Sequence, residues 1–227
     1  PSIILHSWLE VKIQNNWIII DPSNNINMNN ENNKLVYEES SKLVGILDPN
    51  RKPGEKCLNS VVLGGDELID EYLPKDISLV NGVGTLPGDN KRTEISKKYR
   101  EKGFSFSTVI HPSAILSSEV EIEEGVQIMA GATIQRNVKI GKDSIINTNS
   151  SVDHDCLVGE SVHISPGVTL GANVIIGDCS HICLGSSLIQ NIKIGKGSIV
   201  AAGSIIFEDI PENTKYIPLV KSNLKEL

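Results

Sequence analysis

An aliphatic residue stands at every sixth position from Ile110 to Ile206, without an exception. Four residues after each one comes a small or β-branched residue, from Ala114 through Val120 and onward to Ile210. A fixed period of six residues is the signature of a parallel β-helix built from hexapeptide repeats. The aliphatic positions are Ile110, Leu116, Ile122, Ile128, Ile134, Ile140, Ile146, Val152, Val158, Ile164, Leu170, Ile176, Ile182, Leu188, Ile194, Val200 and Ile206.

The period also predicts the geometry of the coil. Two inward positions per hexad suit a short flat strand, and the other residues form a corner or face the solvent. Three hexads then close one triangular coil, so residues eighteen apart lie above one another. One such interior column is Ile128, Ile146, Ile164, Ile182 and Val200. An α-helix would show a period of 3.6 and an antiparallel sheet a strict alternation, and neither fits this segment.

The composition excludes several classes of protein. The net charge is −7 and the isoelectric point is about 5.3, which argues against a surface for nucleic acid or anionic membrane. The four cysteines show no C-x-x-C spacing, as expected of free thiols in a reducing compartment. No apolar run has the length of a membrane span, and the basic-then-apolar pattern of a signal peptide is not seen, so neither is expected. We therefore expect a cytoplasmic protein.

The chain is expected to divide into four segments. Residues 1–34 are irregular and include seven asparagines between Asn24 and Asn33. Residues 35–109 alternate strand and helix patterns and predict a small, incomplete α/β Rossmann-like domain. Its strands are expected at 43–47, 61–63 and 77–80, and its helices at 66–72 and 93–102. The β-helix occupies 110–210, and 211–227 form a C-terminal tail.

Several motifs carry a resemblance to a known family. They are Thr108–Ala114, Val44–Asp48, Val62–Gly65, Arg92 and, most specifically, Asp153-His154-Asp155-Cys156 followed by His163-Ile164-Ser165-Pro166-Gly167. These motifs resemble sugar acetyltransferases of the NeuD/PglD type. Those proteins are sialic acid O-acetyltransferases and UDP-amino-sugar N-acetyltransferases of bacterial surface-glycan pathways.

The resemblance implies a fold, a reaction and an assembly. The β-helix is expected to wind left-handed, with acetyl-CoA as co-substrate and no metal. The acceptor is expected to be a sugar or nucleotide-sugar, which the 35–109 domain binds. Three prisms are expected to pack as a homotrimer, with the cofactor in the groove between neighbouring subunits.

His154 is the candidate catalytic base. Acetyl transfer needs a group that takes a proton from the attacking hydroxyl or amine, and histidine suits this because it titrates near neutrality. His154 stands two residues after the inward Val152, so it is expected to point outward. The resemblance assigns Asp155 the role of orienting and polarising this base. Cys156 is expected to face inward and to be inert.

The resemblance assigns further residues to the two substrates. His163 matches the position that contacts the acetyl end of the cofactor, and Leu184 and Ala202 match contacts to coenzyme A. Asn147 and Asp48 match positions near the acceptor. His181 lies eighteen residues after His163 and is expected to stack above it as an ordinary surface residue.

Two departures from the family keep alternatives open. Nothing in residues 1–34 matches the family's glycine-rich turn, and Tyr216-Ile217-Pro218-Leu219 replaces its C-terminal Gly-x-Pro-Ala element. A catalytically impaired binding or structural protein is therefore one alternative. The other is a zinc enzyme of the γ-class carbonic anhydrase type, which uses three histidines on this fold, although the spacing here lacks that family's close histidine pair.

Overall fold

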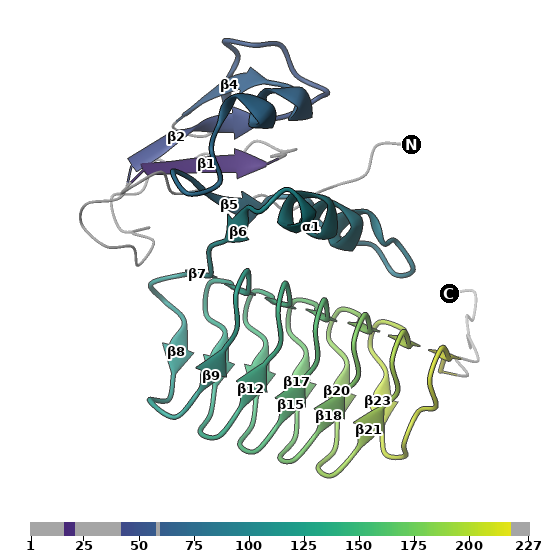
Figure 1. Cartoon of the computed structure of the whole chain (residues 1–227). Helices are drawn as coiled ribbons and strands as arrows, with labels where there is room; N and C mark the ends of the chain where they lie inside the picture. Colours follow the sequence, from purple (N-terminus) through teal and green to yellow (C-terminus); the bar gives the residue numbers. More distant parts are fainter. Residues whose placement is uncertain (1–15, 21–41, 58–59, 219–227) are drawn as a thin grey trace, which may run out of the picture.

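The computed structural model describes residues 16–20, 42–57 and 60–218. Within these residues the chain forms an α/β unit followed by a triangular prism of short parallel strands (Figure 1). The prism is a parallel β-helix, as the six-residue period predicts. No helix in the described part of the chain is long and apolar enough to span a bilayer.

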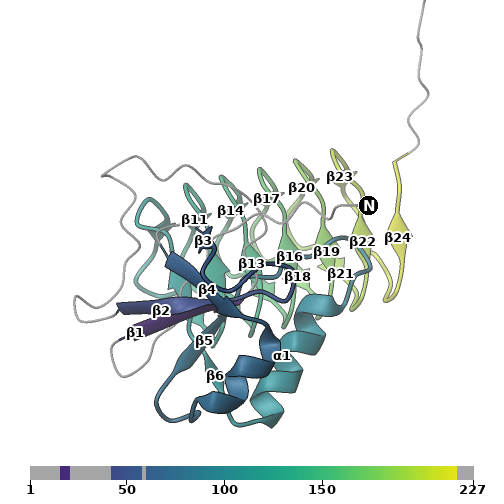
Figure 2. The same cartoon turned by 90° about the horizontal axis from the view of Figure 1, so that it is seen from above.

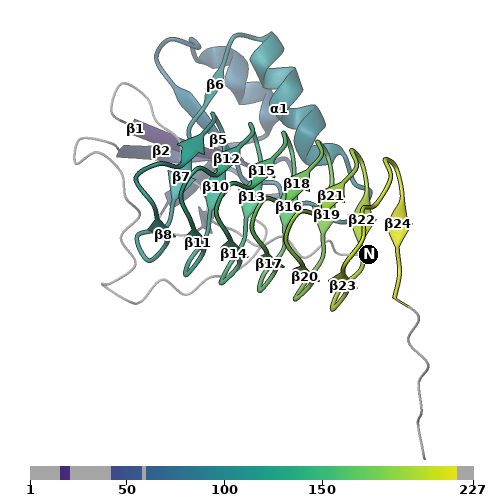
Figure 3. The ribbon, with the colours of Figure 1, turned by 90° about the horizontal axis from the view of Figure 1, so that it is seen from below.

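The prism has three faces, each a parallel sheet whose strands follow one another along the prism axis (Figure 3). The first face consists of β7 (Val109–Ile110), β10 (Gln127–Ile128), β13 (Ile145–Ile146), β16 (His163–Ile164), β19 (His181–Ile182), β22 (Ile199–Val200) and β24 (Lys215–Tyr216). The second face consists of β8 (Ile115–Leu116), β11 (Thr133–Ile134), β14 (Ser151–Val152), β17 (Thr169–Leu170), β20 (Ser187–Leu188) and β23 (Ile205–Ile206). The third face consists of β9 (Glu121–Ile122), β12 (Lys139–Ile140), β15 (Leu157–Val158), β18 (Ile175–Ile176) and β21 (Lys193–Ile194).

The strand register confirms the predicted interior column. Ile128 pairs with Ile146, Ile146 with Ile164, Ile164 with Ile182 and Ile182 with Val200. All five side chains are at most 1% exposed. Each strand is short because the chain must turn a corner every six residues, and some corners use left-handed backbone, as at Asn137 (φ 57°) and Asp155 (φ 62°). Asn and Asp tolerate this conformation better than other residues with a Cβ.

The α/β unit holds a six-stranded sheet in the order β3-β4-β2-β1-β5-β6. All its strand pairs are parallel except β3 with β4. The strands are β1 (Asn16–Ile20), β2 (Lys42–Leu47), β3 (Lys56–Cys57), β4 (Ser60–Gly64), β5 (Ser78–Asn81) and β6 (Ser105–Phe106), and the helices are the 3-10 helix η1 (Asp66–Glu71) and α1 (Lys91–Glu101).

The three strands and two helices expected from the sequence are present within a few residues of their predicted bounds. Strand β1 lies inside the segment 1–34, which the sequence predicts to be irregular. The rest of 1–34, and the part of the Rossmann-like winding that would involve residues 21–41, lie outside the described residues. In the tail, β24 adds a strand to the first face, and residues 219–227 lie outside the described residues.

The α/β unit covers the first face of the prism. Figures 1 and 2 show α1 lying over the prism, and the loop between β5 and α1 reaches the same side. Gln127, from β10, donates a hydrogen bond through Nε2 to the Asn81 carbonyl (2.8 Å), and Arg100 pairs with Asp143. As a result, the outward residues of the first face from Gln127 to His181 are buried.

Candidate active site

His154 and Asp155 occupy the turn between β14 and β15, at the corner that joins the second and third faces. His154 Nδ1 lies 2.7 Å from Asp155 Oδ2, and both side chains are 46% exposed. The neutral imidazole therefore donates its Nδ1–H to the carboxylate and presents Nε2 as a proton acceptor.

Asp155 is itself held in place. Asn137, one coil earlier, donates through Nδ2 to Asp155 Oδ1 (3.0 Å). The hydrogen bonds from Asn137 and His154 lower the pKa of Asp155 below its usual value. The carboxylate is thus ionised at neutral pH and orients the His154 ring. The turn places the two residues as the sequence predicts, with His154 pointing outward.

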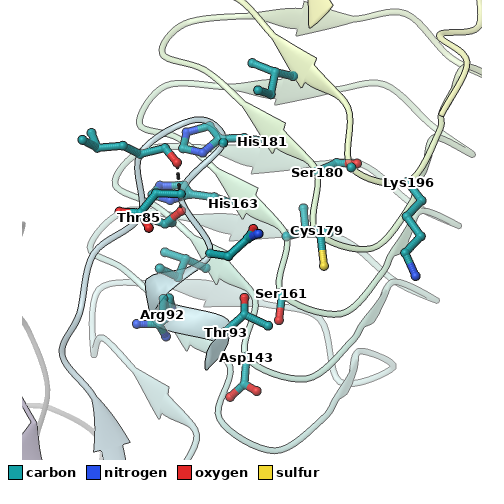
Figure 4. Close-up of a pocket in the computed structure, with 18 of the residues that line it drawn as sticks. Thr85, Arg92, Thr93, Asp143, Ser161, His163, Cys179, Ser180, His181 and Lys196 are labelled. Carbon is teal, nitrogen blue, oxygen red and sulfur yellow. Dashed lines mark hydrogen bonds between the residues drawn. The ribbon is translucent and has the colours of Figure 1, made fainter. Parts of the chain in front are cut away.

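His163 and His181 lie on the first face, on the adjacent strands β16 and β19. Their rings stack, with centroids 4.5 Å apart and planes 21° apart (Figure 4). His163 Nε2 lies 3.2 Å from Asn147 Nδ2, and His181 Nε2 lies 3.1 Å from Ser165 Oγ. The predicted stacking is therefore present.

The prediction that His181 is a surface residue is wrong. Its side chain is buried beneath the α/β unit, and this burial lowers the pKa of His181 to about 4. The six-residue pattern alone places this position on the outside of the prism. The contact with a separate part of the chain makes it buried.

Two cavities lie where the α/β unit meets the first face. The larger, about 510 Å³, lies between α1 with its preceding loop and the prism, and His163, His181 and Lys196 contribute to its wall (Figure 4). The smaller, about 110 Å³, lies beneath residues 82–85 and is lined in part by Asn147 and His163. His163 therefore lies between the two cavities.

The loop over these cavities was not singled out as functional in the sequence. Its Gly82-Val83-Gly84 segment follows the carboxyl end of β5, where ligands bind in open α/β sheets. Arg92 fixes the start of the loop, since its Nη1 donates to the carbonyls of Asn81 and Val83, each at 2.6 Å. Arg92 is itself buried, and this burial lowers its pKa to about 10.

The structure separates the remaining predicted site residues. Leu184 and Ala202 are exposed at corners that join the first and second faces, in successive coils. Asp48 follows β2 and is 1% exposed. Within its own turn it accepts a hydrogen bond from Asn50 N (2.8 Å) and forms an ion pair with Arg51, whose Nε lies 3.3 Å from Asp48 Oδ2. Neither Asp48 nor the His154–Asp155 pair lines either cavity. Among the described residues, no group of three or more His, Cys, Asp or Glu side chains is placed to hold a metal ion.

Comparison with known proteins identifies the class. Residues 119–154 match the model of the bacterial transferase hexapeptide family (six repeats). The chain is 32% identical to the acetyltransferase domain of PglB from Neisseria gonorrhoeae, solved with acetyl coenzyme A. The match covers 75% of this chain and 80% of that one, with a TM-score of 0.69.

A mutant of perosamine N-acetyltransferase from Caulobacter crescentus, solved with CoA and GDP-perosamine, is also 32% identical. That match covers 79% of this chain and 83% of that one, with a TM-score of 0.68. No curated protein sequence matches the chain significantly. The chain belongs to the hexapeptide-repeat sugar acetyltransferases.

Proposed function

We propose that the protein transfers an acetyl group from acetyl-CoA to a sugar or nucleotide-sugar in bacterial surface-glycan synthesis, in the cytoplasm. The observation that carries this proposal is the His154–Asp155 pair at an exposed corner of the prism, 2.7 Å apart. The related PglB domain was solved with acetyl coenzyme A, and the related perosamine enzyme with CoA and a GDP-sugar. The first supports acetyl-CoA as the donor here, and the second supports a nucleotide-sugar as the acceptor.

In the proposed mechanism, the acceptor's hydroxyl or amine attacks the thioester carbonyl directly. His154 Nε2 takes the proton of the attacking group, and the bond from carbon to sulfur breaks. The imidazolium then returns this proton to the departing sulfur, so that coenzyme A leaves as a free thiol. Asp155 stabilises the imidazolium that forms. Residues 110–210 then form the acetyl-transfer domain, and residues 35–109 bind the acceptor.

A covalent acetyl-enzyme has no place in this mechanism. Cys156, the thiol nearest to His154 in the sequence, is fully buried and points its Sγ toward the Gly171 carbonyl (3.2 Å). Burial raises the pKa of Cys156 to about 11, so the thiolate needed for attack is scarce at neutral pH.

The proposed substrate contacts follow two edges of the prism. His163, Leu184 and Ala202 lie on the first face or at the corner where it meets the second, and we assign them to the cofactor. Asn147 and Asp48 are proposed to lie toward the acceptor. His154 stands at the opposite edge of the second face. In a cyclic homotrimer the His154 edge of each copy would lie against the opposite edge of its neighbour, so that two copies together would form a complete site.

The His154→Ala variant tests the catalytic role. Turnover, measured by thiol release with amino sugars, sialic acids and their nucleotide derivatives as acceptors, is expected to fall at least about a hundredfold. The affinity for coenzyme A is expected to change little, because His154 acts on the acceptor's proton. Cys156→Ala, the matched control in the same turn, is expected to keep most of the activity.

Near-normal turnover in His154→Ala would remove the base assignment. Absence of activity in the parent protein with every acceptor, together with tight coenzyme A binding, would favour the alternative of an impaired binding protein.

A further inference from the structure

Arg136 lies next to the proposed base, one coil earlier on the same edge of the prism. The Asp155 backbone N–H donates to the Arg136 carbonyl (3.1 Å), which fixes the register of the two turns. Residue 136 therefore stacks against residue 154 at about the 4.8 Å spacing of neighbouring strands. Arg136 is exposed. Its guanidinium is thus within reach of an acceptor whose reacting group contacts His154.

The Arg136 side chain is not needed to hold the site together. Both oxygens of the Asp155 carboxylate already have a donor, Asn137 Nδ2 at Oδ1 (3.0 Å) and His154 Nδ1 at Oδ2 (2.7 Å). These hydrogen bonds lower the pKa of Asp155, and the positive charge of Arg136 adds to their effect from nearby. Among the described residues, the guanidinium itself forms no ion pair or hydrogen bond. Its donors are therefore available to a ligand.

Arg136 is also the only Lys or Arg at this edge of the prism. The two corner residues of each successive coil are Ser118-Glu119, Arg136-Asn137, His154-Asp155, Ala172-Asn173, Gln190-Asn191 and Glu208-Asp209. An anionic acceptor that approaches His154 would meet the negative charges of Asp155 and, two coils earlier, Glu119. The charge of Arg136 offsets this repulsion, whereas an uncharged sugar needs no such group.

The position of Arg136 along the prism separates it from the proposed cofactor contacts. In the proposed assignment the cofactor runs from His163 toward Leu184 and Ala202, that is, toward later coils. Rotation about a three-fold axis parallel to the prism keeps every residue at its own height, so the cofactor extends past His154 in the same direction. Arg136 lies on the other side of His154, toward the end of the prism that is joined to the α/β unit. This is the side that we assign to the acceptor.

We infer that Arg136 is a specificity-determining residue that binds an oxyanion of the acceptor, a phosphate or a carboxylate, beside the base His154. A guanidinium suits this role because its parallel N–H donors match two oxygens of either group. The inference rests on the proposed function. It narrows the acceptors to those that carry a negative charge close to the attacking hydroxyl or amine.

Arg136→Gln tests the inference, because it removes the charge and keeps a polar side chain. Lys142→Gln is the matched control, since Lys142 is an exposed residue at a corner between the third and first faces and loses the same charge. Nucleotide-sugars, sialic acids and sugars without an acidic group are compared as acceptors. In Arg136→Gln the KM for an anionic acceptor is expected to rise about ten- to a hundredfold, and the KM for acetyl-CoA to change less than about twofold. Arg136→Lys is expected to recover part of the loss, and Lys142→Gln to match the parent.

The acceptor class that loses affinity identifies the bound group. A rise confined to nucleotide-sugars assigns a phosphate, and a rise confined to sialic acids assigns a carboxylate. Equal changes in KM for charged and uncharged acceptors would overturn the inference, as would turnover of uncharged acceptors alone. An altered pH profile of kcat with an unchanged acceptor KM would show that Arg136 acts only through Asp155, and would also reject the contact.

A binding measurement separates this inference from the proposed function. The full-length parent and both Gln variants are titrated calorimetrically with UDP-N-acetylglucosamine, GDP-mannose and N-acetylneuraminic acid, with and without coenzyme A. Weaker binding to Arg136→Gln alone, in a protein inactive with every acceptor, would reject acetyl transfer and retain the anion contact. Equal binding to the parent and Arg136→Gln, or no binding of any probe to the parent, would overturn the inference.

Discussion

His181 is a histidine that the fold keeps neutral. Its ring lies against His163 under the α/β unit, and burial lowers its pKa from 6.5 to about 4. The unfolded chain therefore binds a proton at this residue in a pH range where the folded chain does not. Above the unfolded pKa the two states do not differ, and stability is lost as the pH falls toward the folded pKa.

Replacement of His181 by Phe tests this linkage. The aromatic ring can retain the stack with His163 but cannot take a proton. Between pH 7 and pH 5, the parent is expected to lose about 2 kcal/mol more unfolding free energy than His181→Phe. Urea unfolding at both pH values measures the difference, and contributions from other groups cancel in the comparison. An equal loss in both proteins would show that His181 already titrates normally in the folded state.

At the scale of single elements, each prism strand is too short to be stable alone, and its stability comes from the strands one coil before and one coil after. Ile164 on β16 illustrates this. It is 0% exposed and pairs in register with Ile146 and Ile182. Its six-residue spacing fixes both its neighbours and its inward direction.

Ile164→Asp is expected to abolish cooperative folding, because a carboxylate would enter an apolar interior without a partner. Leu157→Asp is the control, since Leu157 is an exposed residue on the outward side of the preceding strand, β15, on the third face. Circular dichroism during thermal unfolding measures both variants. A soluble Ile164→Asp protein with a sharp transition would contradict the inward register.

The sequence predicts the prism well because its contacts repeat with the period itself. It also places His154 and Asp155 on one turn, since they are neighbours in the chain. It does not predict the burial of His181 or the cavities around His163. These depend on the contact of residues 82–97 with the first face, which joins two differently built parts of the chain and has no repeat to reveal it. The sequence pattern likewise does not predict that the Asp48 carboxylate is engaged within its own turn.

At the scale of the whole molecule, the second face of the prism has candidate site residues on both edges. His154 stands at the edge that the second face shares with the third. Leu184 and Ala202 stand at the edge that it shares with the first face, which also carries Asn147 and His163. Ile115 and Ile205 project from this face and are 66% and 63% exposed, and Phe207, on the His154 edge, is 65% exposed. Ile115 and Ile205 are on the two end strands of the face, and the outward residues between them are Thr133, Ser151, Thr169 and Ser187, so the apolar side chains are separate positions and form no single patch. We propose this face as the contact around a three-fold axis because such a contact brings the His154 edge of one copy toward the opposite edge of the next.

Subunit complementation tests whether neighbouring copies share the site. We consider trimers that contain both His154→Ala and His163→Ala chains, purified through two different tags and checked by light scattering. If each site takes His154 from one copy and His163 from the next, one site in every mixed ring is intact. Such trimers are expected to show about a third of the parental activity, although each variant alone is inactive.

Mixed trimers of His154→Ala and Asp155→Ala are the control. These two residues belong to the same turn of one chain, so no arrangement of the copies rebuilds the pair, and activity should stay at the level of the single variants. If His154 and His163 instead acted within one chain, the first mixture would be as inactive as this control. A monomeric mass for the parent protein at micromolar concentration would exclude the shared site directly, because the two edges of a single prism lie on either side of the second face and cannot meet.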